Sequence, residues 1–331
     1  MGRMKECIRS LPVIGTLARW LVGWVKLPFK VNRLVDATES MTAAIQAVSA
    51  GTPPPGPQPI VVVAYPTMTN LVSQLPTVEQ LESETFARWA EIMKVPCVIH
   101  RKNWEYAYIL QALDETGNLQ PGRKGLGFGV GKEPLAAVMA RRGCDLVVTD
   151  LTPEEALAKG WATTNQYSQT LADMNIRSIC DPDTFARRVS YRYADMRAIP
   201  SGLTGFDFTW SCCSLEHLDS LENGVRFIHE SLACVRPGGI AVHTTELNLS
   251  SNDLTIETGP VVAYRRRDIE ALARHLMAQG HEIVLNFTLG NKPGDHLVEG
   301  APDWSKTPHP LKFVLSTFVL TAIGLLIRKR A

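Results

Sequence analysis

The segment from Lys124 to Asp150 constrains the fold of this chain more than any other part of the sequence. A short apolar stretch leads into the glycine-rich turn GLGFGVG, and a helix-forming stretch follows it. A second apolar stretch then ends in the carboxylate of Asp150. Glycines between a strand and a helix let the backbone approach a ligand closely. The segment therefore predicts a strand, a turn, a helix and a second strand of an α/β fold.

The same rhythm of apolar and amphipathic stretches continues to the end of the chain. Such alternation favours an α/β fold with a doubly wound, Rossmann-like sheet of seven strands. Two more helices are expected ahead of it, at 78–93 and 103–115. The expected strands are 124–128, 145–149, 189–194, 206–211, 239–244, 282–288 and 316–327, and the other expected helices are 133–141, 221–235 and 267–279.

Four regions are expected along the 331 residues. Residues 1–50 predict a helical extension, and the proline density of 51–59 predicts a linker. Residues 60–122 are expected to be mostly helical, although the stretch IVVVAY at their start has no clear placement. Residues 123–331 are expected to form the α/β domain, whose final apolar run is short for a membrane anchor.

The charge of the chain is concentrated at its N-terminus. Residues 1–33 hold seven basic side chains and one acid, whereas the whole chain has a net charge of +1. With Trp20 and Trp24, this pattern is typical of a helix lying in a membrane interface, and a helix packed on the protein's own core is the alternative. A cytoplasmic protein in peripheral contact with the inner face of the membrane is expected.

The overall composition excludes other classes of function. The balanced net charge indicates no nucleic-acid partner. Seven cysteines without a CxxC or Cys/His spacing fit a reducing compartment and indicate no structural zinc site. A metal-assisted reaction through Glu246 and Asp253 is conceivable, but their spacing is not diagnostic, so no metal is expected.

The glycine turn and the acid after it indicate an adenosine cofactor. Pro134 stands where a dinucleotide fingerprint has its third glycine, which favours S-adenosylmethionine (SAM) over a nicotinamide dinucleotide. Asp150 can accept hydrogen bonds from both ribose hydroxyls. Asp195 can accept one from an adenine amino group while Met196 packs on the ring. A plain tight turn, a helix-capping acid and a loop acid are the alternatives.

Polar side chains follow the later strands, where ligands sit in open α/β sheets. His217 can serve as a general base, can orient the cofactor, or can be a structural cap. The strand at 239–244 leads into HTTELN, which predicts a polar substrate pocket or a structural hydrogen-bond network. HRKNWE at 100–105 suits contact with a carboxylate or a sugar, or a solvated helix start. The candidate catalytic residues are His243, His217 and Glu246, and the candidate substrate-binding residues are Arg101, Trp104, Thr245 and Asn248.

These segments together resemble the class I SAM-dependent methyltransferase superfamily over about residues 97–328. The closest resemblance is to a bacterial subgroup found among polysaccharide, O-antigen and other surface-glycan genes. The superfamily often has an acid two residues before the first glycine of its GxG motif, where this chain has Gly127. The resemblance rests on GFGVG, VVTDL, ADM, FDFTWSCCSLEHL and VRPGGIAVHTTE, and for the subgroup on HRKNWE, GLGFGVGKEPL, SLEHLDSLENG, HTTELNLSSND, YRRRDIE and HPLK…TAIGLLIRK.

The resemblance implies a set of cofactor contacts. Glycines at 129 and 131 would pass under the methionyl-ribose, and Ser211 would lie near the methyl donor. The methionine amino group would be held by backbone carbonyls, Glu133 or the 100–105 segment. The full set of expected cofactor-binding residues is Gly127, Phe128, Gly129, Gly131, Asp150, Asp195, Met196 and Ser211.

The expected activity is O-methylation of a sugar hydroxyl in a glycan or a lipid-linked polysaccharide. His243 or His217 would act as the base, and Glu246 would orient the base or the substrate. Homo-oligomerisation is open. Three alternatives remain at this point: a small-molecule or lipid methyltransferase, a nicotinamide-dependent oxidoreductase, and a non-catalytic membrane-associated scaffold.

Overall fold

The computed structural model describes residues 57–161, 166–168, 170–300 and 309–331. Backbone contacts divide the chain into two units, Met1–Gly56 and Pro57–Ala331, and all of the described residues belong to the second unit. The helical extension expected at 1–50, the basic segment within it and most of the linker at 51–59 lie outside the described residues.

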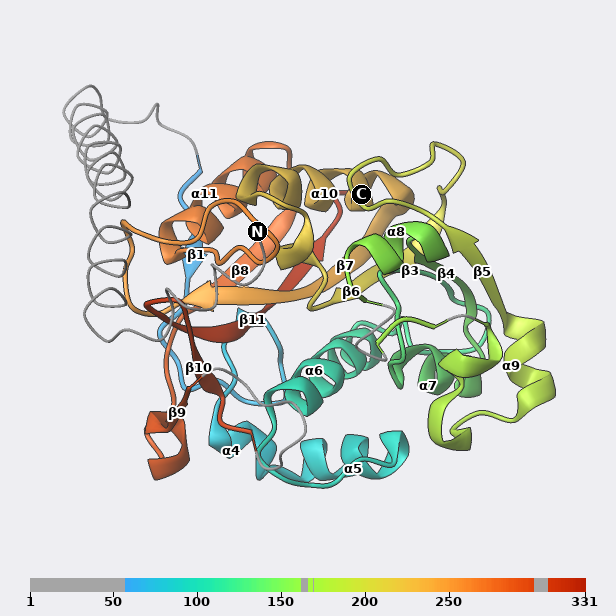
Figure 1. Cartoon of the computed structure of the whole chain (residues 1–331), viewed down its shortest axis with the longest axis horizontal. Coiled ribbons are helices and arrows are strands. Elements are labelled where there is room, and N and C mark those ends of the chain that lie inside the picture. The colour runs from blue at the N-terminus through green and yellow to red at the C-terminus, as the bar shows by residue number, and fades with distance from the viewer. Residues whose placement is uncertain (1–56, 162–165, 169, 301–308) are drawn as a thin grey trace, which may run out of the picture. The chain divides into compact units, whose positions relative to one another are not determined.

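A single mixed sheet forms the centre of this unit (Figure 1). The expected seven strands are present, in the order β5, β4, β3, β6, β7, β11, β8. The first five run parallel, and β11 is antiparallel to both of its neighbours. The strands are β3 (Lys124–Phe128), β4 (Asp145–Asp150), β5 (Val189–Tyr193), β6 (Phe206–Cys212), β7 (Val235–Asn248), β8 (Glu282–Asn286) and β11 (Phe318–Arg328).

Four short strands extend this sheet. β1 (Ile60–Val61) and β2 (Ser73–Gln74) pair in parallel with β8, which gives the unplaced IVVVAY stretch its position. β10 (Lys312–Leu315) forms a hairpin with β11 and pairs with β9 (Val298–Glu299). The strand expected at 316–327 therefore begins in a hairpin turn, where Ser316 has a positive φ of 59°, and continues as β11, the second arm of that hairpin. None of the helices within the described residues is long and apolar enough to cross a membrane.

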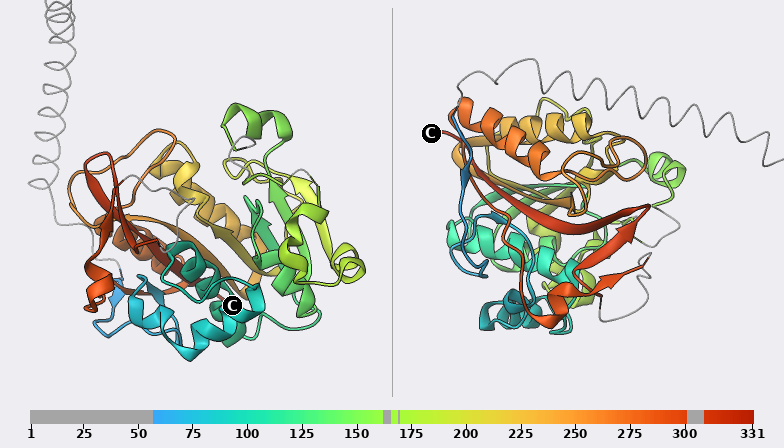
Figure 2. Two further views of the ribbon diagram at one scale, coloured as in Figure 1. Left: turned by 60° about the horizontal axis from the view of Figure 1, so that its bottom comes forward. Right: turned by 90° about the vertical axis from the view of Figure 1, so that its left-hand side faces the viewer.

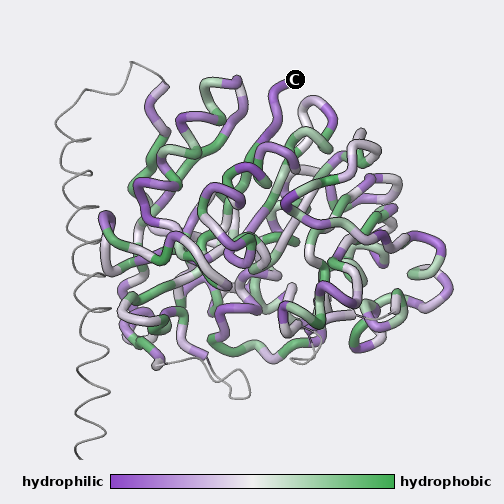
Figure 3. The backbone as a smooth tube through the Cα atoms, turned by 45° about the horizontal axis from the view of Figure 1, so that its top comes forward, coloured by the Kyte–Doolittle hydropathy of each residue, from purple (hydrophilic) through white to green (hydrophobic). Residues whose placement is uncertain are grey.

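Helices cover both faces of the sheet (Figure 2). One face carries α4 (Val78–Leu81), α5 (Glu84–Met93), α6 (Arg101–Glu115), α7 (Leu135–Arg141) and α9 (Pro182–Arg188), whose apolar side chains share a core with Phe208 and Trp210. The opposite face carries α10 (Leu221–Cys234) and α11 (Arg266–Ala278), which pack with Leu126 and Phe128. Hydrophobic stretches run through the centre of the unit in Figure 3. The doubly wound arrangement is confirmed.

Local signals explain where the helices begin. The helix expected at 78–93 is divided in two because the side chain of Ser83 accepts a hydrogen bond from the Phe86 backbone N–H and caps α5. Likewise, Thr152 caps α8 (Pro153–Ala158) with a capping box, and Ser220 caps α10. The helix expected from 133 begins at Leu135, after Pro134.

Candidate functional site

The glycine turn lies at the carboxyl end of β3. Gly129 adopts a positive φ of 59°, and a Cβ there would lie 2.6 Å from Ser214 Oγ. A Cβ on Gly131 would lie 2.2 Å from the carbonyl oxygen of Gln166. Only glycine satisfies both positions, because a side chain would collide with Ser214 at one of them and with the Gln166 carbonyl at the other. The side chain of Phe128, by contrast, is fully buried against Phe227, so only its backbone faces the turn.

Gly127 leaves no room for the acid that the superfamily often has at this position. A Cβ there would lie 2.4 Å from the Trp210 ring and 2.5 Å from Val130. The nearest acid along the chain is Glu133, which is 7% exposed and has one carboxylate oxygen, Oε2, without a hydrogen-bond partner among the described residues. Burial raises the pKa of Glu133 to about 8. This carboxyl group therefore suits a cationic amino group next to the glycine turn.

Asp150 closes β4, as expected for the ribose contact. It is half-buried, and its Oδ1 accepts a hydrogen bond of 2.8 Å from the Leu151 backbone N–H. Burial raises its pKa to about 6. A pair of ribose hydroxyls would restore hydrogen bonds to this partly desolvated carboxylate.

Asp195 and Met196 follow β5. Met196 is buried, and its sulfur lies 3.5 Å from where a Cβ on Gly129 would be, so it borders the glycine turn. Asp195 is held by Arg197, whose Nε and NH2 lie 3.0 and 2.7 Å from Asp195 Oδ2. Arg197 also pairs with Asp219. The adenine contact of Asp195 therefore competes with an ion pair that the sequence did not indicate, and it stays a prediction.

His243 and Ser211 point away from the expected site. The imidazole is fully buried, with Nδ1 2.8 Å from Ser211 Oγ and Nε2 3.1 Å from Ser231 Oγ. Burial lowers the pKa of His243 to about 3. A base needs an accessible lone pair, and both ring nitrogens here are engaged inside the core. The expectation that His243 is the general base is therefore corrected: it is a structural side chain, and Ser211 serves as its partner.

His217 lies at the edge of the sheet, in the 3₁₀ helix Leu215–His217. Its Nδ1 is 2.8 Å from the carbonyl oxygen of Pro260, and its ring meets Trp161 edge-on at 4.5 Å between centroids. Since a carbonyl only accepts, Nδ1 carries the proton and Nε2 carries the lone pair of the neutral ring. Burial lowers the pKa of His217, which favours this neutral form.

Glu246, at the end of β7, forms a buried ion pair with Arg101 from the first turn of α6. Arg101 also lies 3.6 Å from Glu105, one turn further along α6, and its guanidinium stacks on the ring of Phe313. Burial raises the pKa of Glu246 to about 7 despite the neighbouring Arg101 charge. The structure thus brings together Arg101 and Glu246, which the sequence had proposed separately.

Four further residues of this cluster were not named among the candidate site residues: Glu105, Cys213, Glu216 and Thr244. Glu105 Oε2 accepts hydrogen bonds of 2.7 Å from both Thr244 Oγ1 and Cys213 Sγ. Burial alone would raise the pKa of Glu105, but the charges of Lys102 and Arg101 hold it below its usual value. Glu216, also buried, accepts a 3.1 Å hydrogen bond from Thr245. Glu105 and Glu216 belong to the motifs HRKNWE and SLEHL. Their spacing in the sequence does not predict that α6 packs against the ends of β6 and β7.

Trp104 and Asn248 do not line the site. Trp104 is fully buried, stacks on Tyr108, and donates a 2.9 Å hydrogen bond from Nε1 to Gln80 Oε1. Asn248 is 4% exposed and uses both ends of its amide within the following loop, to Ser250, Ser251, Leu254 and Thr255. The expected substrate contacts of these two residues are corrected: each is a structural side chain.

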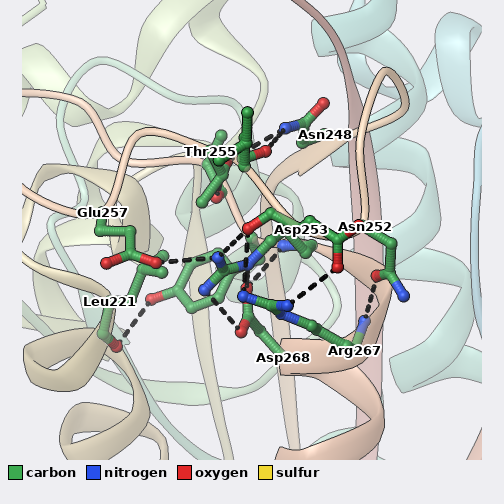
Figure 4. Close-up of polar contacts among 12 residues, drawn as sticks. Leu221, Asn248, Asn252, Asp253, Thr255, Glu257, Arg267 and Asp268 are labelled. Atoms are coloured by element: carbon green, nitrogen blue, oxygen red, sulfur yellow. Dashed lines mark hydrogen bonds and ion pairs between the residues drawn. The ribbon is translucent and has the colours of Figure 1, made fainter. Parts of the chain in front are cut away.

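The loop after β7 is anchored by the YRRRDIE motif (Figure 4). Arg265 binds both carboxylate oxygens of Asp268, the carbonyl oxygen of Asp253 and the carboxylate of Glu257. Arg267 pairs with the Asp253 carboxylate, so that side chain belongs to this anchor and not to the Glu246 cluster. These contacts order the segment that presents Pro260 to His217.

Residues 126–243, which span the glycine turn and the strands up to His243, match the family model described as a methyltransferase domain. Within these residues the chain carries a SAM-dependent methyltransferase domain. The expected cofactor, SAM, is confirmed with the family, and the nicotinamide alternative is not supported. No curated protein matches the sequence.

The solved structures that this chain resembles are only weakly similar to it in sequence and in backbone structure. A sarcosine dimethylglycine methyltransferase described as putative, from Galdieria sulphuraria, is 20% identical over 43% of this chain and 46% of its own, with a TM-score of 0.33. A phosphoethanolamine N-methyltransferase from Haemonchus contortus is 18% identical over 57% and 40%, with a TM-score of 0.36. A TehB-like SAM-dependent methyltransferase from Corynebacterium glutamicum is 16% identical over 76% and 98%, also at 0.36. The chain spans less than half the length of the first two, and likenesses this weak identify no acceptor.

Proposed function

We propose that this methyltransferase transfers the methyl group of SAM to a hydroxyl group of a sugar, in a glycan or a lipid-linked polysaccharide. The observation that carries the proposal is the polar edge formed by Glu216, His217 and Glu246 beside the glycine turn. The loop that holds Glu216 and His217 touches that turn, since Ser214 Oγ donates to the Gly129 carbonyl oxygen at 3.4 Å. This contact supports the proposal that the acceptor and the cofactor bind along one edge.

The residues around the glycine turn fit SAM. Gly129 and Gly131 form a turn without side chains, Asp150 offers a partly desolvated carboxylate, and Glu133 has an unpartnered buried oxygen. The ribose would lie on Asp150 and the amino group on Glu133. Bound SAM supplies a methyl group activated by its sulfonium charge. The protein's own part is to align the acceptor oxygen and to take its proton.

A sugar hydroxyl is a weak nucleophile, so a base is useful. His217 meets this need, because the Pro260 carbonyl fixes the proton on Nδ1 and leaves the lone pair on Nε2. Glu246 and Arg101 form a rigid charged pair that can orient further hydroxyls through charge-assisted hydrogen bonds.

The chemistry of this edge favours a polyhydroxylated acceptor over a flat apolar one. Acids, a histidine, an arginine and threonines gather there, beside the rings of Trp161 and Phe313, whereas Trp104 is buried in the core. A quinone or a lipid would need apolar contacts, whereas a sugar matches buried donors and acceptors that otherwise lack partners.

Work at the inner face of a membrane is part of the same proposal. It rests on the basic, tryptophan-bearing segment 1–33, which would bind an anionic surface and meet a lipid-linked acceptor. Removing residues 1–50 should release the protein from membrane fractions. Unchanged fractionation would remove this part of the proposal and leave the acceptor chemistry intact.

The acceptor is tested by incubating the full chain with labelled SAM and glycan precursors of the host, followed by mass spectrometry of the products. The expected product carries one added methyl group on a sugar oxygen. Label found only on small amines, quinones or lipid head groups would overturn the proposal, and label found nowhere despite SAM binding would favour a non-catalytic role.

A further inference from the structure

We propose that Cys213, Glu216 and Glu246 bind a divalent metal ion of the zinc type at the carboxyl edge of β6 and β7. One ligand atom from each residue, a sulfur and two carboxylate oxygens, lies within 4.8 Å of the others. A thiolate combined with carboxylates favours a borderline metal such as Zn²⁺ over Mg²⁺ or Ca²⁺. Three protein ligands leave a fourth position open, as in catalytic zinc sites.

Unpartnered oxygens in the same place indicate that a cation belongs there. Glu246 is 4% exposed, and while Arg101 holds its Oε1, its Oε2 has no hydrogen-bond partner among the described residues. Glu105 is fully buried, and its Oε1 likewise lacks a hydrogen bond within that part of the chain. Leaving a buried carboxylate oxygen unpaired costs free energy, which a bound cation would offset at Glu246.

The balance of charge around the ligands points to a divalent ion. The carboxylates of Glu105, Glu216 and Glu246 face the cations of Arg101 and Lys102. With Cys213 as a thiol, this group carries one negative charge more than positive ones. Binding a divalent metal ion and releasing the thiol proton brings the sum to zero, so the buried charges are then balanced.

Each proposed ligand already has a partner that fixes its orientation. Cys213 donates from Sγ to Glu105 at 2.7 Å, Glu216 accepts from Thr245 at 3.1 Å, and Glu246 is held by Arg101. Such outer contacts orient the ligands of metal sites. When the metal binds, the S–H bond of Cys213 breaks as the sulfur–metal bond forms, and the proton passes to Glu105, its present acceptor, and on to solvent.

The open position gives the metal a role, and that role rests on the proposed function. An acceptor hydroxyl bound there would lose its proton more readily, because a metal ion lowers the pKa of a coordinated oxygen. His217 is next to Glu216 in the chain and is placed to receive that proton. Binding of the metal does not itself depend on the identity of the acceptor.

The test is a titration of the metal-free full chain with Co²⁺, which reports a bound thiolate through a charge-transfer band in the near ultraviolet. One equivalent should produce the band, and Zn²⁺ should abolish it by displacement. Cys213→Ser should lose the band, and Glu246→Gln should bind Co²⁺ about tenfold more weakly or worse. The control is Cys234→Ser, which removes a buried thiol on α10 and should keep the band.

Two results would overturn the proposal: no band in the wild-type protein, or an undiminished band in Cys213→Ser. Circular dichroism and calorimetric SAM binding establish that each variant is folded. Methyl transfer to sugars without any bound metal would overturn the role given to the metal in the reaction and leave the proposed function standing. A normal band without transfer to sugars would support the metal site and remove the proposed acceptor.

Discussion

His217 donates a 2.8 Å hydrogen bond from Nδ1 to the carbonyl oxygen of Pro260, 43 residues further along the chain. This contact assigns the ring tautomer and leaves Nε2 as the lone pair at the sheet edge. Replacing His217 with Gln should lower the rate of methyl transfer about 100- to 10,000-fold, the usual contribution of a general base, with little change in SAM affinity. Single-turnover kinetics with labelled SAM measure the effect.

His229→Gln is the matched control for His217, because His229 lies on α10, faces His275 and takes no part in the proposed reaction. It should turn over like the wild type. A His217→Gln variant with wild-type turnover would exclude the base assignment.

Glu133 should anchor the amino group of SAM. At pH 7 its carboxyl group is largely protonated, because burial raises its pKa to about 8. Binding a cation favours the carboxylate, so SAM binding should release a proton and its enthalpy should depend on the buffer. Glu133→Gln should abolish this release and weaken binding about tenfold or more, measured by calorimetry. The exposed Glu84→Gln should change neither, and a proton release that survives Glu133→Gln would point to another group.

An acid inserted at Gly127 should destabilise the protein instead of improving SAM binding. Its Cβ would overlap the Trp210 ring and Val130, an overpacking that typically costs about 1–3 kcal/mol. Urea unfolding of Gly127→Asp measures the loss. Gly202→Asp is the control, since a Cβ on Gly202 meets nothing within 4 Å. Equal stability of the two variants would show that the pocket under Gly127 can adapt.

His243 should make stability depend on pH. Its pKa is about 3 in the folded protein and near the ordinary 6.5 when unfolded, so between these values only the unfolded state binds the proton. The stabilisation is complete above pH 6.5 and falls by about 1.4 kcal/mol per unit as the pH drops below it. His243→Gln should remove this slope, which denaturant unfolding at pH 7 and pH 5 detects. The same slope in both proteins would contradict the burial of a neutral ring.

Trp104→Phe should act on stability alone. The substitution removes the Nε1–H donor to Gln80 Oε1, which keeps its hydrogen bond from the Thr77 backbone N–H, so the cost is roughly 0.5–1.5 kcal/mol. We expect a lower midpoint of unfolding and an unchanged KM for the acceptor. A raised KM with normal stability would restore Trp104 to the acceptor site.

Local pattern was enough to predict the strands and the cofactor turn. The alternation of apolar residues and the GLGFGVG glycines act between neighbours in the chain, so β3, β4 and β6 begin and end close to their expected bounds. The same alternation along β7 sends Thr244 and Glu246 toward α6, and His243 and Thr245 toward α10 and the 3₁₀ helix. It does not tell which face reaches the ligand, which is why the prediction of His243 as a base is wrong.

The strand–turn–helix order, the glycine turn and the acid of Asp150 were thus determined by the sequence itself, because short-range sterics and hydrophobic periodicity dictate them. The acceptor side was decided only by the tertiary structure. Arg101 and Glu246 are 145 residues apart, and Glu105 and Thr244 are 139 apart, yet the packing of α6 across β6 and β7 buries them together. Such pairings depend on how two faces pack and on which buried charges then compensate one another, and no local pattern in the chain encodes either.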